Sequence, residues 1–106
     1  MAFVYLIKER DGEHRYKIGS TRSHDVSKRL KQLQTGNSSE LTIEDSFETE
    51  TPFKLEKMLH NNLHSSRVNG EWFELEKETV ENFKQICESL QGIIDSLKDN
   101  PFYSKK

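Results

Sequence analysis

Side chains able to bind a metal ion follow Thr51-Pro52, where Glu56, His60 and His64 recur at four-residue intervals. On a helix this spacing places all three on one face. Two His four residues apart on a helix can bind zinc, but HNNLH lacks the Glu that follows the first His in zinc-protease helices. A Glu56–His60 pair across one helical turn is the plainer interpretation, and zinc is kept as the lesser alternative.

Three further polar side chains that could take part in chemistry are spread over the first half of the chain. Tyr5 lies within VYL, Lys17 directly precedes Ile18-Gly19, and Arg29 follows about one turn after Asp25. Ammonium and guanidinium groups bind phosphate oxygens, and a phenol can exchange a proton with water. Each also has a plain structural interpretation, Tyr5 as a strand residue and Arg29 as a surface charge on a helix. A shared chemical role requires that the elements carrying these residues bring them together.

Hydrophobic periodicity predicts those elements. Residues 3–8 and 14–20 are rich in β-branched and aromatic side chains and flank Asp11-Gly12, which is typical of an antiparallel hairpin. The later patterns predict, in order, a helix over about residues 25–35 capped by Asp25, a strand from Leu41 to Phe47, and a helix over about residues 52–64 opened by Thr51-Pro52. A polar connection over 65–70 and large side chains in 71–75 follow, and the latter close the core.

The C-terminal quarter predicts one long amphipathic helix, because apolar residues recur every three or four positions from Val80 to Leu97. Its apolar stripe can cover the core or form a homodimer, and Gly92 within the helix favours covering. The expected fold class is α/β, with a small central antiparallel three-stranded sheet flanked by helices. The expected organisation is a core over 1–75, the helix over 76–100 packed on it, and a flexible tail over 101–106.

Charge is unevenly distributed along the 106 residues, although the net charge is only −2. Residues 8–31 contain eight Lys or Arg and four acids, a net charge of +4, whereas the chain from Glu40 onward has a net charge of −6. One basic end suits a local phosphate site better than broad nonspecific binding to nucleic acid.

The sequence also indicates a compartment. Cys87 is the single cysteine, so no internal disulfide can form. No apolar run approaches the roughly 20 residues of a membrane span, and the first residues lack the features of a secretory signal. An intracellular protein, cytoplasmic or nuclear, with no membrane partner is expected.

The order of five short segments, taken together, resembles a known family. VYLIK, YKIGST, KRLKQLQTG, LEKMLH and GEWFEL cover about residues 3–75. They resemble the GIY-YIG nuclease superfamily, in particular the branch whose second signature reads KIG and which occurs in phage and meiosis-associated proteins. The resemblance implies a GIY-YIG-like fold and an endonuclease that hydrolyses DNA phosphodiester bonds with one Mg²⁺ or Mn²⁺.

The resemblance also implies roles for individual residues. Tyr5 would orient or deprotonate the attacking water, Arg29 would bind the phosphate, and Glu56, as a hard oxygen donor, would hold the metal. His60 would support Glu56. Gly19 would let the backbone approach the site closely, because a glycine inside a strand is costly unless the space is used. The predicted substrate-binding residues are Gly19, Arg22, Lys28 and Lys31.

Two positions depart from the family pattern. Phe3 stands in place of the glycine of the first signature, and Lys17 in place of the tyrosine of the second. Strand alternation predicts that Tyr16 faces away from the site and that Lys17 takes the inward position, where it can stabilise phosphate charge. These departures leave two alternatives: a nucleic-acid-binding module of the same fold without catalysis, and a dimerisation or interaction domain built on the C-terminal helix.

Overall fold

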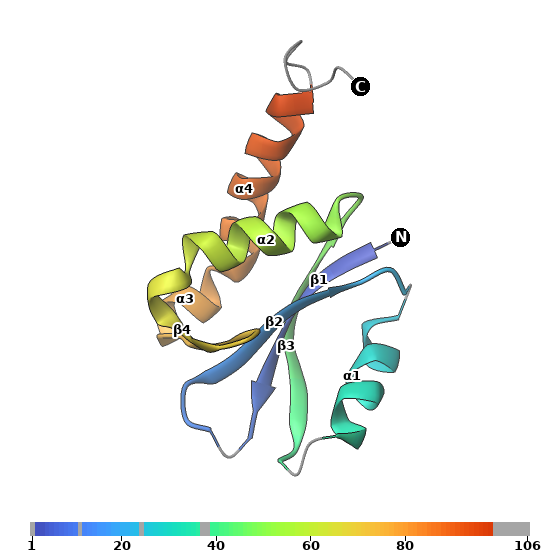
Figure 1. Cartoon of the computed structure of the whole chain (residues 1–106), viewed down its shortest axis with the longest axis vertical. Coiled ribbons are helices and arrows are strands. Elements are labelled where there is room, and N and C mark those ends of the chain that lie inside the picture. The colour runs from blue at the N-terminus through green and yellow to red at the C-terminus, as the bar shows by residue number, and fades with distance from the viewer. Residues whose placement is uncertain (1, 11, 24, 37–38, 99–106) are drawn as a thin grey trace.

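A computed structural model describes residues 2–10, 12–23, 25–36 and 39–98 (Figure 1). Asp11 of the predicted hairpin turn, the end of the predicted helix at residues 99–100 and the predicted tail lie outside these ranges. Within them, none of the helices is both long and apolar enough to cross a membrane.

The predicted hairpin forms the centre of an antiparallel sheet. β1 (Ala2–Glu9) pairs with β2 (Arg15–Thr21), and Tyr5 lies opposite Gly19. β3 (Leu41–Thr49) pairs with the other edge of β1 and contains a bulge, at which Leu6 lies opposite Asp45 and Ile7 opposite Ile43. The bulge reverses the alternation along β3. It explains why the sequence pattern of this segment fits a strand imperfectly.

The sheet has five strands, so the prediction of three is wrong. β5 (Trp72–Glu74) pairs with β2, β4 (Arg67–Asn69) pairs with β5, and the strand order is β3-β1-β2-β5-β4. Gly70 has a positive φ of 51°, which lets the chain reverse between β4 and β5. All three residues of β4 are exposed. The strand therefore has no apolar alternation by which the sequence could distinguish it from a polar connection.

The two central helices begin where their capping residues predict. α1 (Val26–Thr35) begins after Asp25, whose carboxylate accepts from the Ser27 amide at 2.9 Å. α2 (Pro52–Asn62) has Pro52 in its first turn, and it ends two residues before the predicted boundary. His64 lies in the short 3₁₀ helix η1 (His64–Ser66) that follows.

The predicted C-terminal helix is divided into α3 (Lys77–Glu81) and α4 (Phe83–Lys98). Four residues of α4, Phe83, Cys87, Leu90 and Ile94, are buried in the core. Through these residues α4 packs on the core, and the far end of α4 projects past α2 (Figure 1). Ile93 and Leu97 are exposed, and a homodimer through this helix stays a prediction.

The core has two parts, one on each face of the sheet. Val4 and Leu6 of β1 pack with α2 and α4, whereas Tyr5 and Ile7 pack with α1. β2 alternates in the same way, because Tyr16 belongs to the α2 side and its neighbour Lys17 lies over the Trp72 ring on the other. Tyr16 and Lys17 thus face opposite ways, as the alternation predicts.

Candidate active site

The candidate site lies where β2 continues past the end of β5. β5 pairs with Arg15 to Lys17, and the Ile18 amide donates to the carbonyl of Glu71, which directly precedes β5, at 3.0 Å. Beyond Ile18, Ser20 and Thr21 of β2 border a hollow that residues of α1 also line, and Ser20 contacts Glu56 of α2. Side chains from both helices can therefore meet around this end of the strand.

Tyr5 and Arg29 meet on the α1 side. Tyr5 is fully buried, and a Cβ atom on Gly19 would collide with its phenol, so only glycine fits opposite it. Arg29 Nε donates to the Tyr5 hydroxyl at 3.4 Å. Burial raises the pKa of Tyr5, the Arg29 guanidinium lowers it, and the charges of Glu71 and Glu56 raise it further. At neutral pH the phenol is protonated, and its hydrogen points away from Arg29.

Glu56 approaches from α2 through Ser20. Ser20 Oγ donates to Glu56 Oε1 at 2.5 Å, and only 17% of the Glu56 side chain is exposed. Burial raises the pKa of Glu56, and the nearby Glu71 carboxylate raises it further, while the Ser20 hydrogen bond opposes the shift. Two acids face each other here, a cost that a bound cation would relieve.

His60 positions this carboxylate from one turn further along α2. Its Nε2 lies 2.9 Å from the Ile18 carbonyl and 3.6 Å from Glu56 Oε2. A carbonyl only accepts, so Nε2 carries the hydrogen and donates to the backbone. The ring packs edge-on against Phe73, with the two centroids 5.0 Å apart. The imidazole is thereby held between the sheet and Glu56.

Sequence reasoning missed Glu71, which lies at the centre of the site. Its carboxylate is 3.3 Å from Lys17 Nζ, and its charge acts on Tyr5, Arg29 and Glu56. In the sequence, Glu71 belongs to residues 71–75, whose large side chains are predicted to close the core. Only the pairing of β5 with β2 brings it beside the second signature.

The predicted substrate-binding residues occupy three different places. Arg22 and Lys28 line a hollow of about 270 Å³ together with Arg29, and Arg22 lies 4.9 Å from the centroid of the Phe53 ring. Lys31 is exposed on α1 and does not line this hollow. Gly19 is beside Tyr5, as described above.

One domain family matches most of the chain. The T5orf172 domain covers residues 2–88, which include the five strands and every candidate residue named above. The chain belongs to the T5orf172 domain family. Domains of this family occur in phage and related proteins and are linked to GIY-YIG-like and HNH-type nuclease folds. No curated protein and no solved structure matches the chain.

Membership of the T5orf172 family points to a nuclease-like or DNA-binding function. The donors around Glu56 are consistent with a metal of the magnesium type. Within the described ranges no group of three or more His, Cys, Asp or Glu is placed to hold a metal, and the exposed His64 turns back to the Asn61 carbonyl at 3.0 Å. Mg²⁺ needs no such cage, because it keeps several waters and uses one or two carboxylates plus substrate phosphate.

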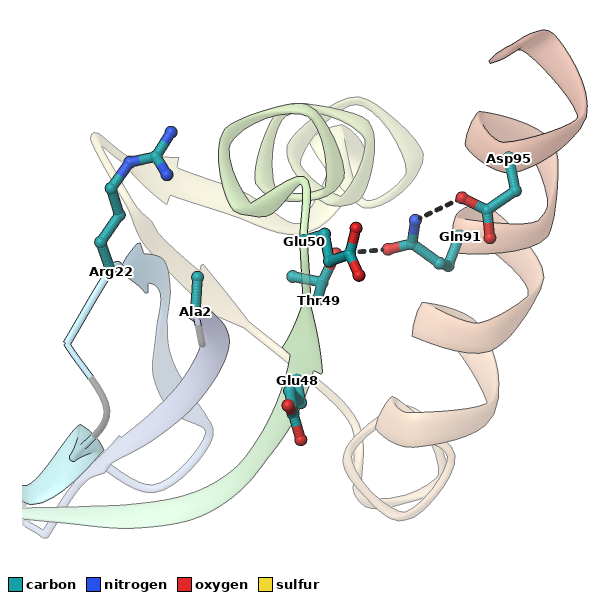
Figure 2. Close-up of a pocket in the computed structure, with 7 residues that line it drawn as sticks. All are labelled: Ala2, Arg22, Glu48, Thr49, Glu50, Gln91 and Asp95. Carbon is teal, nitrogen blue, oxygen red and sulfur yellow. Dashed lines mark hydrogen bonds between the residues drawn. The ribbon is translucent and has the colours of Figure 1, made fainter. Parts of the chain in front are cut away.

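A larger hollow of the T5orf172 domain, about 760 Å³, lies between the end of β3 and α4 (Figure 2). We call it the acidic hollow; it is lined by Ala2, Arg22, Glu48, Thr49, Glu50, Gln91 and Asp95. Three carboxylates and a single guanidinium border it, which disfavours phosphate. Figure 2 shows Gln91 held between Thr49 and Asp95, through hydrogen bonds of 2.6 and 3.0 Å.

Proposed function

We propose that this T5orf172 domain is a GIY-YIG-type endonuclease that hydrolyses DNA phosphodiester bonds with Mg²⁺ or Mn²⁺. The observation that carries the proposal is the convergence of Tyr5, Arg29 and Glu56, from three separate elements, around the open end of β2. A phenol, a guanidinium and a carboxylate within one site meet the main needs of phosphodiester hydrolysis. Family membership supports the same class of function.

Arg29 and Tyr5 act on the phosphate and on the attacking water. The guanidinium of Arg29 is partly exposed and has donors beyond Nε, with which it can bind phosphoryl oxygens. The Tyr5 oxygen accepts from Arg29, so its hydroxyl hydrogen can orient a water molecule. Because its pKa is raised, Tyr5 acts here by positioning water rather than as an ionised base.

Glu56 and Glu71 are the residues that would hold the metal ion, with Ser20 and His60 fixing Glu56 in place. When bound, a divalent cation would supply charge neutralisation at the phosphate and activation of water. The donor set is consistent with this use, because both carboxylates are hard oxygen donors. The Ile18 carbonyl anchors the His60 imidazole 3.6 Å from Glu56 Oε2, so His60 acts as a positioning residue by packing beside this carboxylate.

Lys17 would add a second positive charge for the phosphate. In the absence of ligand its ammonium pairs with Glu71 at 3.3 Å and lies 5.3 Å from the centroid of the Trp72 ring. If Glu71 held a metal ion, its ion pair with Lys17 would be weakened. The released ammonium would then be free to donate to a phosphoryl oxygen.

The test is cleavage of labelled single-stranded, nicked and branched DNA by wild type, Glu56→Gln and Glu74→Gln. With Mg²⁺ or Mn²⁺, we expect products from the wild type and from Glu74→Gln, whose carboxylate lies on β5 but is exposed. Glu56→Gln and addition of EDTA should both reduce cleavage to background. Products formed equally by Glu56→Gln would contradict the proposed site.

One observation favours a second candidate, a DNA-binding module of the same fold without catalysis. Lys17 stands where the second GIY-YIG signature has a tyrosine, and its ammonium is paired with Glu71. In that case the same assay would give a gel shift with the wild type and no products with either metal. Arg29→Ala would then weaken the gel shift.

A further inference from the structure

A second binding feature adjoins the candidate site. The hollow of about 270 Å³ described above, here called the Phe53 hollow, is lined by Ser20, Thr21, Arg22, Ser23, Lys28, Arg29, Gln32 and Phe53. It is slightly smaller than most small-molecule sites, which begin at about 300 Å³. It is therefore suited to one unit of a polymer rather than to a large ligand.

An exposed aromatic ring forms one wall of the Phe53 hollow. Phe53 is 57% exposed, although Arg22 lies 4.9 Å from its centroid. The ring is directed outward because Pro52 and Leu55 of the same helix turn are buried in the core. An exposed phenylalanine beside a guanidinium offers a flat surface on which a nucleobase can stack.

The Phe53 hollow and the candidate site share two side chains. Ser20 lines the hollow and donates to Glu56, and Arg29 lines the hollow and donates to Tyr5. Phe53 also precedes Glu56 by three residues, so both project from one side of α2. A group in the hollow would therefore be next to a phosphate bound at Arg29.

The charge of the Phe53 hollow favours a polyanion. Arg22, Lys28 and Arg29 contribute three cations, and no carboxylate is among the lining residues. Within the described ranges Arg22 and Lys28 form no ion pair within 4.0 Å. The hydroxyl group of Thr21 accepts from the Ser23 amide at 3.1 Å, and its hydrogen can donate to a phosphate or sugar oxygen.

We propose that the Phe53 hollow binds one unpaired nucleotide next to the scissile phosphate, with its base on Phe53 and its phosphate near Arg22 and Lys28. A base paired within a continuous duplex cannot stack on a side chain, so the substrate class is DNA with a single-stranded segment at the cleavage point. The placement of this nucleotide next to the scissile phosphate rests on the proposed function. Binding of the unpaired nucleotide can be tested without cleavage.

The experiment measures fluorescence anisotropy of a labelled single-stranded oligonucleotide and of a blunt duplex of the same length, both in EDTA. Wild type should prefer the single strand. Phe53→Ala should weaken single-strand binding about tenfold and leave duplex binding unchanged, since stacking on an aromatic side chain contributes this much per base. Phe53→Tyr, which keeps the ring, should bind like the wild type. Arg22→Gln should reduce the salt dependence of binding by about one phosphate contact.

Ile93→Ala is the matched control, because Ile93 is a similarly exposed apolar residue on α4, far along the chain from the site. It should bind both ligands like the wild type. Equal single-strand binding by wild type and Phe53→Ala would overturn the inference, as would equal losses in Phe53→Ala and Ile93→Ala. A lower melting temperature of Phe53→Ala with an unchanged preference for single strands would assign Phe53 a structural role and overturn it too.

The same samples separate this inference from the proposed nuclease. Single-strand binding that depends on Phe53, without cleavage in Mg²⁺ or Mn²⁺, supports the nucleotide site and contradicts the nuclease. Cleavage of continuous duplex DNA that depends on Glu56 but is equal for wild type and Phe53→Ala supports the nuclease. The same result overturns the nucleotide site.

Discussion

The candidate site and the acidic hollow lie on either side of Arg22, and they differ in how their polar groups are satisfied. In the acidic hollow Gln91 accepts from the Thr49 hydroxyl and donates to Asp95, so these three side chains are hydrogen-bonded to one another. In the candidate site Glu56 and Glu71 face each other, and both charges raise the pKa of a buried phenol. The candidate site thus holds two like charges close together in a partly buried place, which is electrostatically unfavourable.

This difference teaches that volume alone does not identify the functional region. The acidic hollow is nearly three times as large as the Phe53 hollow, but three carboxylates border it. Like charges held together in a partly buried place reduce stability, and they persist where a ligand uses them. The predictions below test whether chemistry is confined to one region and structural support to the other.

The largest expected effect is that of Arg29→Ala on cleavage. We expect a loss of about 100-fold in kcat/KM, because the substitution removes a preorganised donor to the phosphate. Arg10→Ala makes the same change at an exposed position paired with Glu40, and Glu50→Gln alters the acidic hollow. Both should cleave at the wild-type rate. A loss in Glu50→Gln as large as in Arg29→Ala would erase the distinction between the regions.

A smaller effect is expected from Glu71→Gln on metal affinity. We expect the midpoint of a Tb³⁺ titration, followed by emission sensitised through the single tryptophan, Trp72, to rise about tenfold. The reason is that one of two oxygen donors loses its charge. Glu74→Gln, on the same strand but exposed, should titrate like the wild type. Identical midpoints for wild type and Glu71→Gln would exclude Glu71 from the metal site.

The smallest effect is expected in the acidic hollow and concerns stability alone. Gln91→Ala removes the acceptor of the buried Thr49 hydroxyl, 2.6 Å away, and should lower the free energy of unfolding in urea by about 1 kcal/mol. Gln85→Ala makes the same change at an exposed position of α4 and should leave stability unchanged. Cleavage should be normal in both variants. Impaired cleavage by folded Gln91→Ala would assign this region a part in function.

Much of the fold was predictable because it depends on local patterns. The hairpin follows from β-branched runs on either side of a turn, α1 from the Asp25 cap, and α2 from Pro52. The two short strands β4 and β5 were not predictable. Their residues carry no periodic apolar signal, and they become strands only because β2 offers a free edge.

The candidate site shows the same division. By itself the sequence determined the identity and order of Tyr5, Lys17, Arg29 and Glu56, and strand alternation determined that Lys17 rather than Tyr16 shares a face with Tyr5. Only the tertiary structure decided that Glu71 joins them and that Phe53 and Arg22 form a hollow beside them. The physical reason is that alternation and capping act over a few residues. Contacts between β2, β5 and α2 join residues more than 30 positions apart, and tertiary side-chain packing together with backbone pairing of β2 and β5 sets those contacts.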